Sequence, residues 1–239
     1  MAEQNTASTT HRSVLVIGAS RGLGKAIVEQ YVARGAHVVA TVRGTEPTPL
    51  HAFARRRPDR VMIEHVDIDD ESELEALAGR LAGRVFDLLY VVAGVSLAPR
   101  SQIAAEIATD AFERMMVTNV LSVMRTVERL QDVVDATGTI AVMSSGQGSI
   151  GNNTNGGFEV YRASKAALNQ LMRSYASRHA GEGRALLLMA PGWVKTDMGG
   201  QGAALEVADS IPPLVDTVDG QRGIPGLRYL DRFGAAVPW

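Results

Sequence analysis

The stretch Gly18-Ala-Ser-Arg-Gly22-Leu-Gly24 decides the fold, because of what stands on either side of it. Val14-Leu-Val-Ile17 comes directly before it, a short apolar run rich in β-branched residues that predicts a buried strand. From Gly24 to Ala33 the apolar residues recur at the spacing of an amphipathic helix. A strand, a glycine-rich turn and a helix in this order are typical of the first unit of a dinucleotide-binding fold.

The glycine spacing is GxxxGxG, which is related to the dinucleotide fingerprint GxGxxG but differs from it. Glycine lets the chain turn tightly and lets the backbone approach a pyrophosphate, while the following helix N-terminus offers N–H donors. Glycine-rich turns are common, so the triplet alone is weak evidence. Its position between a strand and a helix is what favours a dinucleotide.

Outward from this turn, strand-like and helix-like segments alternate along the chain. Further strands are predicted at 37–42, 61–66, 88–92, 139–143, 185–189 and 227–230, and further helices at 101–107, 112–130 and 164–178, with another after the acidic start at Asp67. The predicted fold class is α/β: a doubly wound Rossmann-type fold with an about seven-stranded, mostly parallel sheet and helices on both faces. No linker-like gap interrupts residues 14–239, which predicts one domain, preceded by a polar, flexible N-terminal arm at residues 1–13.

Composition excludes several classes of function. Among 239 residues there is no cysteine, so disulfides, thiolate nucleophiles and Cys-ligated metals are excluded, and the five histidines show no metal-ligand spacing. A formal net charge of −2 advertises no nucleic-acid partner. No run is long and apolar enough to cross a membrane, and the N-terminus has no secretory h-region. We expect a cytoplasmic protein with no metal site, and chemistry that rests on Ser, Tyr, Lys or an organic cofactor.

Two arginines favour NADP over NAD. The second strand of a dinucleotide fold carries an acidic residue at its tip when the ribose 2′-hydroxyl is bound. Here that strand ends in Arg43, and Arg21 lies inside the glycine turn. Guanidinium groups pair bidentately with phosphate oxygens, as a 2′-phosphate requires. The alternative is that both arginines simply face solvent.

Tyr161 and Lys165 stand four residues apart at a predicted helix start, on one face. A free tyrosine has a pKa of about 10, and a neighbouring ammonium should lower it, giving a group that passes protons near neutral pH. Alone the pair is also an ordinary amphipathic helix start. Its context is more specific: the strand 139–143 ends in Ser144-Ser145, at the carboxyl edge where such sheets bind ligands.

Together these motifs resemble the short-chain dehydrogenase/reductase family, from Val14 to Trp239 and in the family's order. The resemblance implies a catalytic set of Asn119, Ser145, Tyr161 and Lys165. It also implies a cofactor site formed by Gly18, Ser20, Arg21, Gly22, Leu23, Gly24, Arg43, Asp67, Ala93, Gly94, Tyr161, Lys165, Pro191, Gly192, Val194 and Thr196. Asp67 would lie near the adenine, and the segment from Pro191 beside the nicotinamide. The loop 144–157 and the ending 231–239 are similar to the C-factor and sniffer-like carbonyl reductases.

Two features depart from the family pattern. Val91-Val92 stands before Ala93-Gly94 where the family usually has Asn-Asn, so any Asn side-chain contact there is lost. The interval between Ser145 and Tyr161 is also wider than usual, and Ser149, closer to the tyrosine, is a rival for the serine role. We prefer Ser145 because it sits at the strand end.

The resemblance implies an NADP(H)-dependent oxidoreductase that reduces aldehydes or ketones, with a small carbonyl or alcohol substrate. An alternative is an NADP-binding regulatory or signalling protein on the same fold, because fold alone does not fix function. A sugar-nucleotide epimerase or dehydratase is less favoured, since little chain remains for a substrate domain. The segment Met198–Val218 is expected to form a mobile, mostly apolar substrate flap. The long predicted helices, 112–130 and 164–178, are suited to form a symmetric interface in a homodimer or homotetramer.

Overall fold

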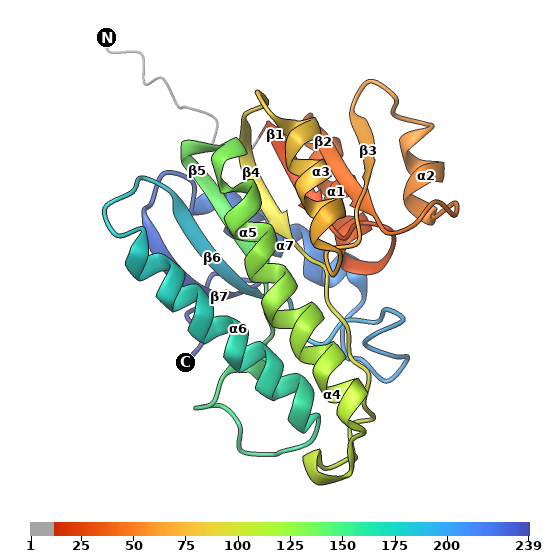
Figure 1. Ribbon diagram of the computed structural model, residues 1–239, viewed down its shortest axis with the longest axis vertical. Coiled ribbons are helices and arrows are strands. Elements are labelled where there is room, and N and C mark those ends of the chain that lie inside the picture. Colours follow the sequence, from red (N-terminus) through yellow and green to blue (C-terminus); the bar gives the residue numbers. More distant parts are fainter. Residues whose placement is uncertain (1–11) are drawn as a thin grey trace.

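A computed structural model describes residues 12–239 and shows a central sheet covered by helices (Figure 1). The seven strands are β1 (Ser13–Ile17), β2 (His37–Val42), β3 (Val61–His65), β4 (Phe86–Val91), β5 (Val134–Met143), β6 (Ala185–Ala190) and β7 (Gly226–Asp231). Every pair is parallel, in the order β3-β2-β1-β4-β5-β6-β7. The predicted doubly wound sheet is therefore confirmed. Most of the predicted N-terminal arm lies outside the described residues, and Ser13 already belongs to β1.

The helices form two layers because side chains of each strand alternate between the faces of the sheet. Val14 and Val16 belong to one buried cluster, and Leu15 and Ile17 belong to the other. The first cluster lies under α1 (Gly22–Ala33), α2 (Pro49–Ala54) and α7 (Val207–Gly220); the second lies under α3 (Glu71–Leu81), α5 (Ser122–Leu130) and α6 (Glu159–Arg178). Strand order reverses between β1 and β4, which opens a crevice at their carboxyl ends.

The helix predicted at 112–130 is interrupted in the structure. α4 (Thr109–Met116) passes into a π-helical turn, η2 (Val117–Leu121), before α5 begins at Ser122. The apolar spacing continues across all three segments, so the pattern alone did not reveal the wider turn. Such π turns are rare and are frequently found at functional sites.

Two other predictions are corrected. The helix expected at 101–107 is only a single 3₁₀ turn (Ala104–Glu106), because most of its residues are exposed, the apolar Ile103 among them, so packing does not stabilise a helix there. Part of the flap expected at Met198–Val218 is helix α7, whose Ile211, Leu214 and Val218 are buried against the sheet and α1. Two prolines inside α7 concealed this helical spacing. Among residues 12–239, no helix has both the length and the apolar character to cross a membrane.

Candidate active site

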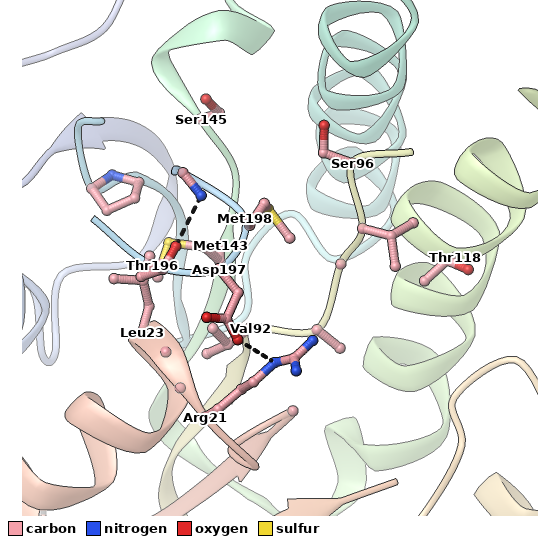
Figure 2. A pocket seen from close by; sticks show the side chains of 18 of the residues that line it. Arg21, Leu23, Val92, Ser96, Thr118, Met143, Ser145, Thr196, Asp197 and Met198 are labelled. Carbon is pink, nitrogen blue, oxygen red and sulfur yellow. Dashed lines mark hydrogen bonds and ion pairs between the residues drawn. The ribbon is translucent and has the colours of Figure 1, made fainter. Parts of the chain in front are cut away.

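A cavity of about 510 Å³ opens at the carboxyl ends of β1, β4, β5 and β6 (Figure 2). Its size is that of an ordinary small-molecule or cofactor site. All the predicted site residues except Asn119 line it: Gly18, Ser20, Arg21, Gly22, Leu23, Gly24, Arg43, Asp67, Ala93, Gly94, Ser145, Tyr161, Lys165, Pro191, Gly192, Val194 and Thr196. Segments far apart in the sequence thus meet in one place.

The glycine turn leaves room that no other residue would leave. A Cβ on Gly24 would lie 2.1 Å from the carbonyl oxygen of Gly18, and one on Gly18 would lie 2.7 Å from the backbone nitrogen of Ala93. Gly18 also has φ of +88°, and its N–H donates to Thr41 Oγ1 at 3.0 Å. The N-cap Arg21 makes no side-chain cap to α1. The helix therefore presents uncapped N–H donors to the cavity, as pyrophosphate binding requires.

The two arginines lie on the cavity but do not converge. The Arg21 guanidinium forms an ion pair with Asp197 at 3.2 Å, across the opening between the glycine turn and the segment after β6 (Figure 2). Arg43 faces Asp67 at 3.9 Å. Both guanidinium groups are largely exposed. Arg43, at the end of β2, is the one placed where a ribose 2′-phosphate is expected.

Ser145 lies just past the end of β5, where it caps the 3₁₀ turn η4 (Gly146–Gly148). Its Oγ accepts a hydrogen bond from the Gln147 N–H at 3.2 Å, and its hydroxyl lies near enough to Tyr161 to lower the pKa of that residue. The rival Ser149 is buried, does not line the cavity, and accepts a hydrogen bond from Asn152 N–H at 3.1 Å. The geometry thus brings Ser145, and not Ser149, to the tyrosine.

Tyr161 and Lys165 lie on consecutive turns of α6, facing the end of β5. Lys165 is 3% exposed, its Nζ donates to the Met143 carbonyl at 3.0 Å, and it lies 5.8 Å from the centre of the Tyr161 ring. Burial lowers the pKa of Lys165 to about 8. Burial also raises the pKa of Tyr161 to about 12, outweighing the opposing hydrogen bond from Ser145.

The expected lowering of the Tyr161 pKa is therefore wrong for the protein without ligand. Desolvation of the phenolate is the largest effect, and the ammonium of Lys165 is not among its causes. A tyrosine with this pKa is protonated throughout the neutral range. It is thus suited to donate a proton and unsuited to act as a resting phenolate base.

Asn119 lies behind the cavity wall, in the π turn η2, and is fully buried. Its Oδ1 accepts from Val95 N–H at 2.7 Å, and its Nδ2 donates to the Val95 carbonyl at 2.8 Å and to Ser164 Oγ at 3.0 Å. The side chain therefore holds the loop after β4 against α6. In that loop the Val92 and Ala93 N–H groups both donate to the Ile17 carbonyl, so backbone bonds support Val91-Val92 without an Asn side chain.

Several lining residues carried no signal in the sequence. Phe158 has φ of +52°, the left-handed region that non-glycine residues rarely adopt, and caps the start of α6 beside Tyr161. No motif marks it. The other lining residues that motif reasoning missed include Val95, Ser96, Thr118, Gln147, Trp193 and Asp197. Across the described part of the chain, no group of three or more His, Asp or Glu side chains is placed to hold a metal ion.

A doubly wound parallel sheet with a glycine turn, an uncapped helix N-terminus and a Ser-Tyr-Lys cluster in one cavity defines a Rossmann-type oxidoreductase. The family model for short chain dehydrogenases matches residues 12–204. The chain belongs to the short chain dehydrogenase family.

Solved structures of high similarity support this assignment. A short-chain dehydrogenase/reductase from Burkholderia multivorans with bound NADP is 50% identical, covers 96% of this chain and 100% of its own, and has a TM-score of 0.94. A carbonyl reductase from Pseudomonas aeruginosa PAO1 in complex with NADP is 34% identical, with coverage of 95% and 99% and a TM-score of 0.87. The curated C-signal of Myxococcus xanthus is 42% identical over 100 residues, which are 42% of this chain and 60% of that protein. These agree with the predicted resemblance to the C-factor and sniffer-like group.

Proposed function

We propose that the protein is an NADP(H)-dependent carbonyl reductase that converts small aldehydes or ketones to alcohols. The observation that carries the proposal is the meeting of Ser145 and the protonated Tyr161 in the same cavity as the glycine turn. The two similar structures with NADP support the choice of cofactor.

The residues around the cavity fit a dinucleotide. The turn needs glycine at 18 and 24 for close packing, and the N-terminus of α1 is free to bind a pyrophosphate. Arg43 is exposed at the cavity end near Asp67, where its guanidinium would pair with a 2′-phosphate. Arg21 pairs with Asp197 through Nε, and its largely exposed guanidinium would offer its other N–H donors to a phosphate.

When bound, the dinucleotide supplies or accepts the hydride. In the proposed reduction Ser145 Oγ donates a hydrogen bond to the substrate carbonyl oxygen and fixes its position. Tyr161 Oη donates a proton to the same oxygen as it gains negative charge. Lys165, buried beside the tyrosine, places positive charge next to the phenolate that remains. Asn119 keeps the wall of the cavity in place through Val95 and Ser164.

The substrate end of the cavity supports a modest, largely uncharged substrate. Phe158, Trp193 and Met198 line it together with the polar Ser96 and Gln147. The part of the expected flap that remains outside α7 includes Met198 (Figure 2) and Gly199, which both line the cavity.

A titration of NADPH against NADH, followed by a screen of aldehydes and ketones with the tighter cofactor, tests the proposal. We expect tighter binding of NADPH and its oxidation by some members of the panel. Tight NADPH binding without turnover of any carbonyl compound would instead favour the alternative of an NADP-binding regulatory or signalling protein. The similarity to C-signal is the observation in favour of that alternative.

A further inference from the structure

Tyr229 lies outside every motif used above, yet its hydroxyl reaches the proposed active site. It stands on β7, opposite Leu188 of β6, and is 3% exposed. Its Oη donates a hydrogen bond to the backbone carbonyl of Ser145. The side chain thus crosses from the last strand of the sheet to the residue that would hold the substrate oxygen.

The backbone at the end of β5 and directly after it is held at three carbonyl groups by side chains from neighbouring elements. Lys165 donates to the Met143 carbonyl at 3.0 Å, Tyr229 donates to the Ser145 carbonyl, and Asn169 Nδ2 donates to the Gly148 carbonyl at 3.3 Å. Of the three, Tyr229 acts on Ser145 itself. The position of the serine is therefore set by side chains as well as by the strand.

The Ser145 carbonyl keeps one other partner. The Gly148 N–H donates to it at 2.8 Å and closes the turn η4. Loss of the Tyr229 hydroxyl would leave this bond alone to close the turn, so the turn would open more readily. What would be lost is the bond that ties the turn to β7.

The chain after β7 packs around Tyr229. The Val237 N–H donates to the Tyr229 carbonyl at 2.9 Å, and the rings of Tyr229 and Trp239 lie 5.4 Å apart. The Arg173 guanidinium lies 4.6 Å from the centre of the Trp239 ring, and Gly151 N–H donates to the Trp239 carbonyl at 2.9 Å. The C-terminal segment 231–239 thus packs against Tyr229 and contacts the loop that follows Ser145.

We infer that Tyr229 is a positioning residue for Ser145. Through the serine carbonyl it fixes where Ser145 Oγ stands relative to Tyr161 Oη, and so where both groups meet a substrate carbonyl oxygen. The inference rests on the proposed function, because it gives Tyr229 its role through the proposed role of Ser145. Small displacements of such groups are costly, since a shift of about 1 Å can lower a rate by about 100-fold.

Tyr229→Phe tests the inference, and Tyr175→Phe is its matched control. Tyr175 is also fully buried in the same cluster, and its hydroxyl donates to Gln131 Oε1 at 2.7 Å, away from the cavity. We expect Tyr229→Phe to lower kcat about tenfold or more while the Kd for NADPH stays unchanged. Tyr175→Phe should lower thermal stability about as much as Tyr229→Phe does, but leave kcat within about twofold of the wild type.

A double-mutant cycle shows whether Tyr229 acts through the serine. In a Ser145→Ala background, Tyr229→Phe should cost little further activity, because the group that it positions is gone. An equal loss in both backgrounds, or a kcat for Tyr229→Phe equal to that of the wild type, would overturn the inference.

Hydrogen exchange supplies a readout that needs no turnover. Exchange of the Gln147 and Gly148 amides should become about tenfold faster in Tyr229→Phe and stay unchanged in Tyr175→Phe. Unchanged exchange in Tyr229→Phe would contradict the positioning role even if no carbonyl substrate were found. Failure of the proposed function gives a different result: either no carbonyl compound is reduced, or Tyr161→Phe retains full activity, whatever the exchange of the turn.

Discussion

Replacing Lys165 by Met should remove a pH-dependent part of the protein's stability. Lys165 is 3% exposed and its pKa falls from 10.5 to about 8 on burial. Each unit of pKa is worth about 1.4 kcal/mol, so the charged form is about 3 kcal/mol less favourable in the folded state than in water. Met is similar in length and carries no charge to bury.

The sign of the effect follows from proton binding. Between about pH 8 and pH 10.5 an unfolded chain keeps a proton on this lysine, while the folded chain has released it. The unfolded state then binds more protons, so the stability of the wild type relative to the Lys165→Met variant rises with pH. Removal of the buried charge should favour the variant by about 3 kcal/mol below about pH 8, and this contribution should vanish by about pH 10.5.

Urea unfolding at a series of pH values measures this difference. The variant also loses the hydrogen bond from Lys165 to the Met143 carbonyl, which costs it about 1–3 kcal/mol at every pH. This cost shifts the difference in unfolding free energy between the two proteins by a constant and does not alter its change with pH. Lys25→Met, which removes a lysine paired with Glu29 on the surface of α1, is the control for loss of a lysine charge. A constant difference between wild type and Lys165→Met across this pH range would refute the reasoning.

Three further predictions concern the cofactor end and the cavity wall. Gly24→Ala should destabilise the protein by about 1–3 kcal/mol and weaken NADPH binding more than tenfold, because the new Cβ would lie 2.1 Å from a backbone oxygen. The control is Gly79→Ala in α3, where a Cβ meets no atom within 4 Å. In the same thermal melt it should be neutral or stabilising by up to about 1 kcal/mol, and in the same NADPH titration it should leave binding unchanged. Arg43→Ala should raise the Kd for NADPH about tenfold or more and that for NADH little, because only NADPH carries the 2′-phosphate; equal effects on both would remove Arg43 from that role. Asn119→Ala should lower stability by about 1–3 kcal/mol and speed exchange of the Val95 amide, and unchanged exchange would contradict its role in holding that loop.

Much of the fold could be predicted because periodicity and turn chemistry are local properties. The run Val14–Ile17 and the glycine turn that follows fixed the first unit, and the acidic stretch after β3 predicted a helix start where Asp70 now caps α3. The same local reading failed for α7, where Pro212 and Pro213 stand inside a helix that is stabilised by packing on α1. Tertiary burial outweighed the local penalty there.

The site divides in the same way. Motifs predicted which segments supply Ser145, Tyr161 and Lys165, because each follows a strand end or opens a helix. Motifs could not predict the direction in which the Tyr161 pKa shifts, since desolvation depends on everything packed around the ring. Motifs also could not predict the position of Tyr229 at the site, because its contact with Ser145 joins residues that are remote in sequence and share no motif.

Turnover by Tyr161→Phe tests the central claim most directly. The variant lacks the hydroxyl that would donate the proton, and the ring that fills the cavity wall is kept. Measured on a carbonyl compound that the wild type reduces, NADPH oxidation should fall by about 100-fold or more, while the Kd for NADPH stays close to that of the wild type. Undiminished oxidation by the variant would contradict the account.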